Sequence, residues 1–309
     1  MRVLVVSSGN SNSVSPFVMD QAEDLKGLGI DIDFYVIKGN GMRGYLNNLS
    51  SYNEKIREFK PDIIHAHYGL SGLFANFQRK APVVTTMHGD DINLKRNRIF
   101  SLIASILSHQ TIVVNELMLK SLITNNVRVI PCGVNSRVFV EYDQTLVRKE
   151  LKLSQDRKYV LFSSSFSRPE KNSKLAFEAI NLLKNKGVDC ELLELKGYSR
   201  IEVAKLFSAV DAALLTSIRE GSPQFVKEAL ATNCPLVSVD IGDVRDLIRV
   251  SSKNYIVDYD AKEVAKSLET IFIDNERSDG RKYINDIDSY VIARKIIIVY
   301  NNILKGKSK

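Results

Sequence analysis

The first 140 residues alternate short apolar runs with longer segments of helical periodicity. Between residues 45 and 59, for example, apolar positions follow steps of four and three, which predicts a helix with one buried face. Such alternation predicts a mostly parallel sheet with helices on both faces. The predicted strands are RVLVV (2–6), DIDFYVI (31–37), DIIHAH (62–67), VVTTMH (83–88), TIVV (111–114) and VRVI (127–130).

The alternation restarts after a polar stretch, EYDQ (141–144), so we expect a second parallel sheet. The last periodic segment, SYVIARKIIIVYNNIL (289–304), is a long amphipathic helix that no predicted strand follows. We predict two α/β domains, residues 1–140 and 141–288, and a terminal helix, residues 289–309, that packs back toward the first domain. Parallel sheets bind ligands beyond the carboxyl ends of their strands, which predicts a ligand in a cleft between the domains. The predicted strands of the second sheet are YVLFSSS (159–165), ELLEL (191–195), AALLT (212–216) and PLVSV (235–239).

Composition narrows the class of protein. The 309 residues suit two domains, and 44% hydrophobic with 26% charged residues is typical of soluble globular chains. The net charge of +7 favours an anionic partner, but it is spread thinly without a basic block, which argues against nucleic acid. Three cysteines stand far apart, without histidine at metal-ligand spacing, which argues against a disulfide framework or a zinc site. With neither a secretory leader nor a run of about 20 apolar residues, the sequence predicts a cytoplasmic protein.

The segment REGSPQFVKEALATNCP (219–235) places one carboxylate in a loop and another on the helix that follows. Glu220 comes just after the predicted strand AALLT, where a parallel sheet binds its ligand. We expect Ser222 to be the N-cap and Pro223 the first helical residue, which leaves free backbone amides facing an anion. Glu228 lies about 7 to 8 Å further along that helix. The two carboxylates can hold different parts of one extended ligand, although the spacing alone is also typical of a solvated pair.

The residues EGSPQFVKEALATNCPLVSVDIGDVRDLI (220–248) resemble the donor-binding segment of the retaining glycosyltransferases of family 4. That family follows the pattern EGFPxxxxEAMAxGxPVVAxxxGGxxE in a GT-B fold of two facing Rossmann-like domains. The resemblance spans nearly the whole chain and implies the same α/β fold, with a C-terminal helix that crosses back to the first domain. Further segments resemble the family in its order: DIIHAHY (62–68), TTMHGDDI (85–92), IPCGVNSRVF (130–139) and SSSFSRPEKNSKLAFEAI (163–180).

The resemblance implies a role for each residue of the donor site. Arg168 and Lys171 match the pair that clamps the donor diphosphate, and fixed positive charge stabilises a departing nucleoside diphosphate. Glu220 matches the glutamate that hydrogen-bonds donor-sugar hydroxyls, and Glu228 matches the one that holds ribose hydroxyls. Glu220 is thus expected to orient the substrate and not to attack it. The backbone expected to bind the sugar and phosphate is that of Gly221, Ser222, Pro223 and Gln224.

The first domain also contains residues that match the family. His88 ends a predicted strand and matches a histidine that contacts the donor sugar near the reacting carbon; a core histidine with satisfied contacts is the alternative. His65 and His67 lie within a strand pattern, which indicates a structural role. The loop after the first strand contains Gly9 and Asn10 and resembles the family's glycine-rich acceptor loop. It is not a GxGxxG dinucleotide fingerprint.

The sequence departs from the family in two places. Between ELLEL and AALLT the family has a longer stretch, with a GxG turn and a further strand, where this chain has only residues 196–211. We expect Lys196 to Tyr198 to replace the missing wall of the base site, with Tyr198 as a stacking surface for the base. An exposed loop tyrosine is the alternative. The family's final GGxxE reads GDVRD here, so Asp246 stands in place of its glutamate.

The segment KRNRIFSLIASIL (95–107) places three cations ahead of an apolar helical run, a pattern typical of helices on a membrane surface. A core helix with a basic start has the same pattern. Because many members of the family use lipid-linked acceptors, the resemblance favours peripheral contact with the inner face of a membrane.

These features predict a retaining glycosyltransferase that moves a hexosyl or N-acetylhexosaminyl group from a nucleotide sugar, expected to be a UDP-sugar, to a hydroxyl. The expected acceptor is a glycan or lipid-linked saccharide in cell-surface polysaccharide synthesis. No cofactor or metal is expected, because Asp90 and Asp91 belong to the HGxD segment and no Asp-x-Asp stands where a metal-dependent enzyme would need it. The resemblance implies front-face displacement, in which the leaving phosphate helps to deprotonate the acceptor. The alternatives are a GT-B-fold nucleotide-sugar epimerase and a non-catalytic nucleotide-sugar-binding subunit.

Overall fold

The computed structural model describes residues 1–9, 14–39 and 41–306 and divides the chain into two compact units. The first unit holds Met1–Gly133 and the segment from Ile287 onward, and the second holds Val134–Asp286. The chain therefore leaves the first unit once and returns to it near the C-terminus. The sequence-based boundaries at 140 and 288 fall a few residues beyond these.

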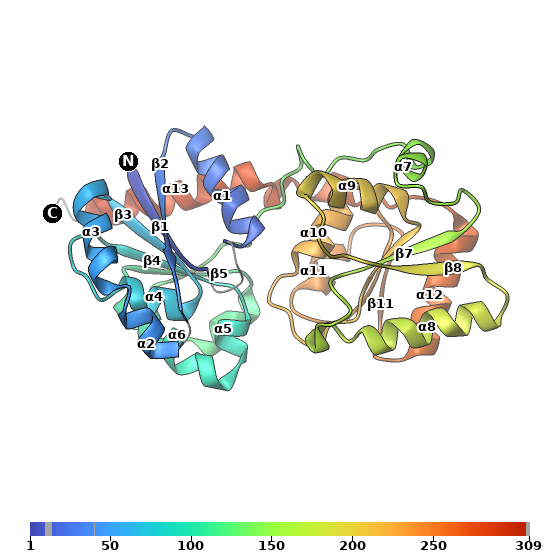
Figure 1. Cartoon of the computed structure of the whole chain (residues 1–309), viewed down its shortest axis with the longest axis horizontal. Coiled ribbons are helices and arrows are strands. Elements are labelled where there is room, and N and C mark those ends of the chain that lie inside the picture. Colours follow the sequence, from blue (N-terminus) through green and yellow to red (C-terminus); the bar gives the residue numbers. More distant parts are fainter. Residues whose placement is uncertain (10–13, 40, 307–309) are drawn as a thin grey trace. The chain divides into compact units, whose positions relative to one another are not determined.

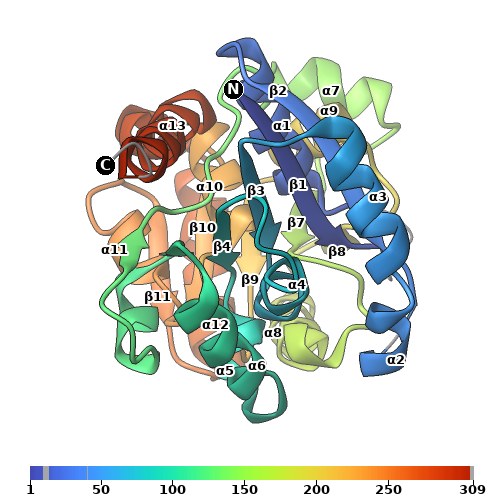
Figure 2. The same ribbon diagram turned by 90° about the vertical axis from the view of Figure 1, so that its left-hand side faces the viewer.

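The first unit is built on a six-stranded parallel sheet in the order β2-β1-β3-β4-β5-β6. Figure 2 shows β1 and β3 side by side, and their register pairs Val3 with Ile63 and Val6 with Ala66. Each strand corresponds to one of the predicted apolar runs, because β-branched residues suit a buried pleated surface. The strands are β1 (Arg2–Ser8), β2 (Asp31–Ile37), β3 (Ile63–His67), β4 (Val83–Met87), β5 (Gln110–Val113) and β6 (Val127–Val129).

Helices cover both faces of this sheet (Figure 1). They are α1 (Pro16–Gly27), α2 (Gly41–Leu46), α3 (Leu49–Phe59), α4 (Gly69–Ala75), α5 (Asp90–Asn93), α6 (Lys95–Leu107), the 3-10 turn η1 (Glu116–Ser121) and α13 (Ser289–Gly306). Successive side chains of a strand point to opposite faces. Val3 and Val5 accordingly join an apolar cluster with α1 and α13. Leu4 and Val6 join another with α3 and α4.

The second unit has a five-stranded parallel sheet in the order β11-β10-β9-β7-β8. Four strands correspond to predicted runs, and the fifth, β11, was not predicted. This strand has only four residues, NYIV, and most of them are half exposed, so the sequence shows little hydrophobic pattern there. The strands are β7 (Lys158–Phe162), β8 (Cys190–Glu194), β9 (Ala212–Leu215), β10 (Leu236–Val239) and β11 (Asn254–Val257).

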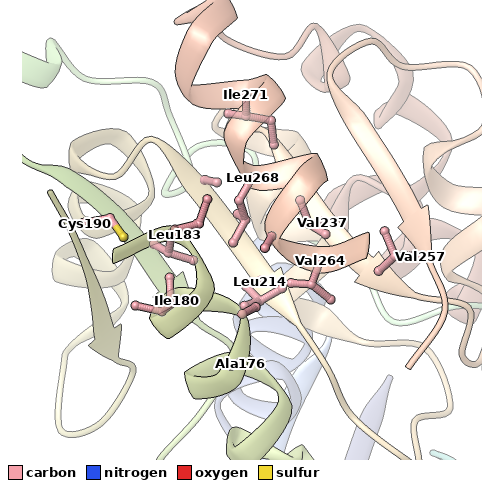
Figure 3. Packing of buried hydrophobic residues seen from close by; sticks show 14 of the residues in the cluster. Ala176, Ile180, Leu183, Cys190, Leu214, Val237, Val257, Val264, Leu268 and Ile271 are labelled. Carbon is pink, nitrogen blue, oxygen red and sulfur yellow. The ribbon is translucent and has the colours of Figure 1, made fainter. Parts of the chain in front are cut away.

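The helices of the second unit are α7 (Gln144–Glu150), α8 (Ser173–Asn185), α9 (Arg200–Ala209), α10 (Gln224–Ala231), α11 (Val244–Ile248) and α12 (Ala261–Asp274), with 3-10 turns η2 (Pro169–Lys171), η3 (Gly280–Tyr283) and η4 (Asn285–Ile287). Figure 3 shows Leu183 of α8 and Leu268 of α12 packed with Leu214 and Val237 of the sheet. On the neighbouring elements, α9 contacts β7 and α10 contacts β9. Across the described ranges of both units, no helix is long and apolar enough to cross a membrane.

Candidate active site

Two loops at the carboxyl edge of the second sheet carry the residues predicted to bind the sugar and the diphosphate of the donor. The strands β7 and β9 are parallel neighbours, so the loops that follow them start at the same edge. The Thr216 hydroxyl joins these loops, at 2.9 Å from the backbone oxygen of Lys171 and 3.0 Å from that of Asn172. Lys171 Nζ then lies 2.5 Å from Glu220 Oε1, with 13% and 14% of the two side chains exposed. The structure thus brings together the residues that the sequence assigned to the diphosphate and to the sugar.

Arg168 lies on the loop that carries Lys171 but pairs with a different glutamate. Its Nε donates to Glu170 Oε1 at 2.7 Å, and its Nη2 lies 2.6 Å from the same oxygen. More than half of the Arg168 side chain is exposed, 53%. An exposed pair of this kind contributes only about 0 to 1 kcal/mol, so it does little to hold the guanidinium away from an anionic ligand.

The helix α10 begins one residue later than the sequence predicted. Pro223 is its N-cap, with φ −68° and ψ 120°, and Gln224 is its first residue. Ser222 does not cap the helix, because its hydroxyl donates to Asp243 Oδ2 at 2.6 Å. Burial raises the pKa of the Asp243 carboxyl. The predicted phosphate-binding loop is therefore hydrogen-bonded to the GDVRD segment, through Ser222 and Asp243.

Gly242 approaches the same loop closely. Its φ is +59°, and a Cβ on it would lie 2.4 Å from the backbone oxygen of Gly221. A side chain at this position would therefore have to displace the loop that follows Glu220. Asp246, the residue that departs from the family pattern, lies exposed on α11.

Glu228 lies on α10 and is nearly buried, with 6% of its side chain exposed. Arg200 Nη1 donates to its Oε1 at 2.5 Å. The guanidinium of Arg200 also lies over the ring of Phe139, with Cζ 4.5 Å from the ring centroid. The sequence reasoning missed Arg200. The pattern SRIE at 199–202 could have revealed it, because this capping box places a helix start, and with it Arg200, beside the expected base site.

Tyr198 lies in the short connection from β8 to α9 and is 45% exposed. Residues 195–199, all of them described, lead from β8 into α9 without a further strand. The family's extra strand is therefore absent from this part of the second unit. The exposed ring of Tyr198 is compatible both with a stacking surface and with an ordinary loop tyrosine.

His88 follows β4 in the first unit and lies among other aromatic rings. Its Nε2 is 3.1 Å from His67 Nδ1, and its Nδ1 is 3.4 Å from Cys132 Sγ. The rings of Phe17 and Tyr68 lie 4.8 Å and 4.7 Å from its own ring, centroid to centroid. The core contacts named as the alternative for His88 are thus present, and they fix the orientation of its ring.

His65 and His67, on the strand β3, are buried, and both have lowered pKa values. Burial lowers the pKa of His67 to about 3. The pKa of His65 also falls well below its usual value, through burial and the neighbouring His67 and His88. His65 hydrogen-bonds Tyr300 of α13 at 2.6 Å and Thr86 at 2.7 Å, which fits the predicted structural role.

Asp91 lies in the same part of the first unit. Burial raises the pKa of its carboxyl to about 6, although backbone N–H groups of Gly89, His88 and Gly69 donate to it. These bonds hold the backbone around His88 in place.

Gly9 follows β1, and its backbone N–H donates to Ile37 O at 2.9 Å. A Cβ on Gly9 would lie 2.4 Å from Val36 Cγ1, so a side chain here would have to displace the side chain of Val36 in β2. Asn10, the second predicted acceptor residue, lies outside the described residues. Of the predicted site residues that the structure describes, Gly9 and His88 belong to the first unit and the others belong to the second. Among the described residues, no three His, Cys, Asp or Glu side chains are grouped to hold a metal ion.

Two family models match the chain, and together they cover more than half of it. Residues 11–138 match "Glycosyltransferase Family 4", and residues 187–274 match "Glycosyl transferases group 1". The N-acetyl-alpha-D-glucosaminyl L-malate synthase of Bacillus anthracis is 24% identical, over 78% of this chain and 74% of that protein. The glycosyltransferase TuaC of Bacillus subtilis (strain 168), assigned to teichuronic acid biosynthesis, is 27% identical over 69% of this chain and 62% of TuaC.

Solved structures show the fold. The sucrose-phosphate synthase of Thermosynechococcus elongatus superposes with a TM-score of 0.82 at 15% identity, over 99% of this chain and 100% of that one. Anabaena HepE, solved in complex with UDP, has a TM-score of 0.76 at 14% identity, over 98% of this chain and 100% of that one. Both domains thus have the Rossmann-like architecture of the GT-B fold. With this fold and both family matches, the chain belongs to the group 1 glycosyltransferases of family 4.

Proposed function

We propose that this glycosyltransferase moves a hexosyl or N-acetylhexosaminyl group from a UDP-sugar to a hydroxyl, with retention of anomeric configuration and without a metal. The proposed acceptor is a glycan or a lipid-linked saccharide in cell-surface polysaccharide synthesis. The observation that carries the proposal is the contact between Lys171 and Glu220 at the carboxyl edge of the second sheet. HepE has been solved with UDP-glucose, and TuaC is assigned to teichuronic acid biosynthesis, which supports the donor and acceptor classes.

The donor would exchange one ion pair for two sets of contacts. Its diphosphate offers anionic oxygens to Lys171 and to the exposed Arg168, and its sugar offers hydroxyl donors to Glu220. Positive charge fixed beside the diphosphate stabilises the charge that develops on it as it departs, which is often the largest single catalytic contribution. In this arrangement Glu220 orients the sugar and forms no covalent bond with it.

The proposed transfer proceeds on one face of the sugar ring. The acceptor oxygen forms a bond to the anomeric carbon as the bond from that carbon to the β-phosphate oxygen breaks. The acceptor proton passes to an oxygen of the departing diphosphate, so the products are the glycoside and UDP. His88, held by His67 and Cys132, is the first-unit residue proposed to contact the donor sugar, and the loop from Gly9 is proposed to meet the acceptor.

A ligand screen followed by product analysis tests this function. At 100 times its dissociation constant a ligand adds about 2.7 kcal/mol of stability, so UDP and UDP-sugars should raise the melting temperature more than GDP, ADP and their sugars. Transfer to a saccharide acceptor should survive EDTA, and NMR of the product should show the anomeric configuration of the donor. Indifference of the melting temperature to every nucleotide, or an inverted product, would overturn the proposal.

We also assign α6 to the surface of an anionic membrane. Ile99, Ile103 and Ile106 follow helical spacing and form an apolar stripe, with 59%, 40% and 58% of each residue exposed. Arg98 of the same helix is exposed beside this stripe, which gives the face a charge that suits anionic lipid. These exposures support a surface helix over the buried core helix that the sequence also allowed.

Co-sedimentation with vesicles tests the membrane surface. Vesicles containing phosphatidylglycerol should carry down the full-length protein, and the variant Ile99→Ser/Ile106→Ser should stay in solution. Ile273→Ser, at a residue 77% exposed on the second unit, is the matched control and should bind like the unaltered protein. Equal sedimentation with neutral and anionic vesicles would remove the assignment.

A further inference from the structure

The donor unit contains an ion pair that the sequence reasoning did not expect. Glu228 accepts a 2.5 Å hydrogen bond from Arg200 Nη1, and only 6% of its side chain is exposed. The two residues come from the first turn of α9 and from the middle of α10, and these helices contact each other. A carboxylate this deeply buried is stabilised by a hydrogen-bonded cation, so Arg200 contributes to fixing where the Glu228 oxygen lies.

Arg200 is itself fixed by its surroundings. Its guanidinium lies 4.5 Å from the ring centroid of Phe139, which is fully buried and packs edge-on against Phe207. The first turn of α9 is closed by a capping box in which Ser199 and Glu202 bond each other's backbone. A planar guanidinium held against a buried ring presents its N–H groups in a fixed direction. Arg200 can therefore orient a partner and not only neutralise it.

The position of Arg200 follows from the short connection in this chain. Because residues 195–199 lead straight from β8 into α9, Arg200 is the first residue of α9 and follows the end of β8 by six residues. The exposed Tyr198 precedes it by two residues. The short connection of residues 195–199 thus also places Arg200 beside the Glu228 carboxylate.

We propose that Arg200 is the positioning residue of the ribose subsite: it holds the Glu228 carboxylate in the orientation that accepts the ribose hydroxyls of the donor. The inference rests on the proposed function, which gives Glu228 the ribose. A carboxylate accepts about four hydrogen bonds, so Glu228 can accept from the guanidinium and from the ribose hydroxyls at the same time. Arg200 then acts on the ligand through Glu228. Its removal should therefore lower the affinity only for nucleotides that have the ribose hydroxyls.

Titration calorimetry with UDP and 2′,3′-dideoxy-UDP tests this dependence. The unaltered full-length protein should bind the dideoxy nucleotide about tenfold more weakly than UDP, because the hydrogen bonds to a charged acceptor are lost. Arg200→Gln should weaken UDP binding by about the same factor and leave dideoxy-UDP binding unchanged, so that discrimination disappears. Arg157→Gln is the matched control, since it removes an arginine that pairs with Asp189 and Glu191 at the start of β7.

The double variant Arg200→Gln/Glu228→Gln keeps the test valid if Arg200→Gln fails to fold, because no buried carboxylate is then left without its cation. It should bind both nucleotides as Glu228→Gln does, since the two residues act as one unit. Equal weakening of both nucleotides by Arg200→Gln, or unaltered discrimination, would overturn the inference. Failure of the unaltered protein to bind UDP would instead overturn the proposed function.

Discussion

Lys171 and Glu220 form an ion pair, so in the proposed site the recognition of the sugar is linked to that of the diphosphate. Their contact is 2.5 Å long and the loops that carry them are joined through Thr216. Any ligand that takes up only one of them leaves the other without its partner. A complete nucleotide sugar would supply a partner to both, so under the proposed function the pair should favour the intact donor over its fragments.

Replacement of Glu220 should therefore separate binding from transfer. Glu220→Gln should lower kcat/KM about 100-fold, because the sugar loses a charged acceptor. The same change should strengthen the binding of UDP alone, because Lys171 no longer has a carboxylate competing with the diphosphate. Initial rates of UDP release and titration calorimetry measure the two effects. Lys174→Ala, at an exposed lysine on α8, is the control, and undiminished transfer by Glu220→Gln would contradict the site assignment.

The buried histidines of the first unit link its stability to pH. His67 has a pKa of about 3 in the folded protein, lowered by burial, against an ordinary value of 6.5. Protonation therefore favours the unfolded chain, and stability is lost as the pH falls from about 6.5 toward 3. Asp91 acts in the opposite direction, because its raised pKa of about 6 lets the folded protein take up a proton first.

When the pH falls from 7 to 5, the titration of His67 should lower the free energy of unfolding by about 2 kcal/mol. The titration of Asp91 should raise it by about 1 kcal/mol. His67→Asn keeps a polar group near the Nδ1 position and removes the titration. Urea unfolding at both pH values should show that the variant loses about 2 kcal/mol less than the unaltered protein on acidification. An identical acid loss in the two proteins would show that His67 does not titrate as its burial implies.

At the scale of the elements, hydrophobic pattern predicted most strands but not the short half-exposed β11. The start of α10 was misplaced because the hydroxyl of Ser222 has a competing acceptor, Asp243, 21 positions away in the chain. The motifs singled out Lys171 and Glu220, which the structure places in contact. Arg200 was not, because it meets Glu228 only when α9 and α10 pack together. Local patterns thus identify residues within one element, and contacts between elements need the fold.

Gly242 lies between β10 and α11 and closely approaches the loop of Gly221, so its replacement should disturb the proposed donor site. Gly242→Ala should reduce both UDP affinity and transfer about tenfold or more, because the new Cβ meets the backbone oxygen of Gly221. Gly187→Ala is a matched control: this glycine also has positive φ, +86°, but its Cβ would meet nothing within 4 Å. It should lose about 1 kcal/mol of stability and keep its activity. Equal activity in the two variants, measured as UDP release, would show that the close approach does not matter.

At the scale of the whole molecule, the two units differ in how the chain builds them. The second is one continuous stretch, Val134–Asp286, with its own apolar cluster. The first depends on α13, because Ile292, Ile296 and Tyr300 join Val3 and Val5 in its core. Its two chain segments also meet: a Cβ on Gly133 would lie 2.4 Å from Ser289 Cα.

We therefore expect residues 134–286 to fold alone and residues 1–133 to fail. The isolated second unit should unfold cooperatively by circular dichroism and should melt at a higher temperature with UDP. Residues 1–133 should regain a cooperative transition when a short Gly/Ser linker joins residue 133 to residues 287–309. A stably folded fragment 1–133 without α13 would contradict this dependence.

The pairing of Arg168 with Glu170 and of Lys171 with Glu220 gives the proposed diphosphate site built-in counterions. A binding site made of bare cations would collect salt anions and release them when a nucleotide arrives, so its affinity would fall steeply with ionic strength. Here the glutamates already occupy that place, and the nucleotide displaces side chains instead of dissolved ions. Nucleotide affinity should accordingly depend only weakly on salt, even in a chain of net charge +7.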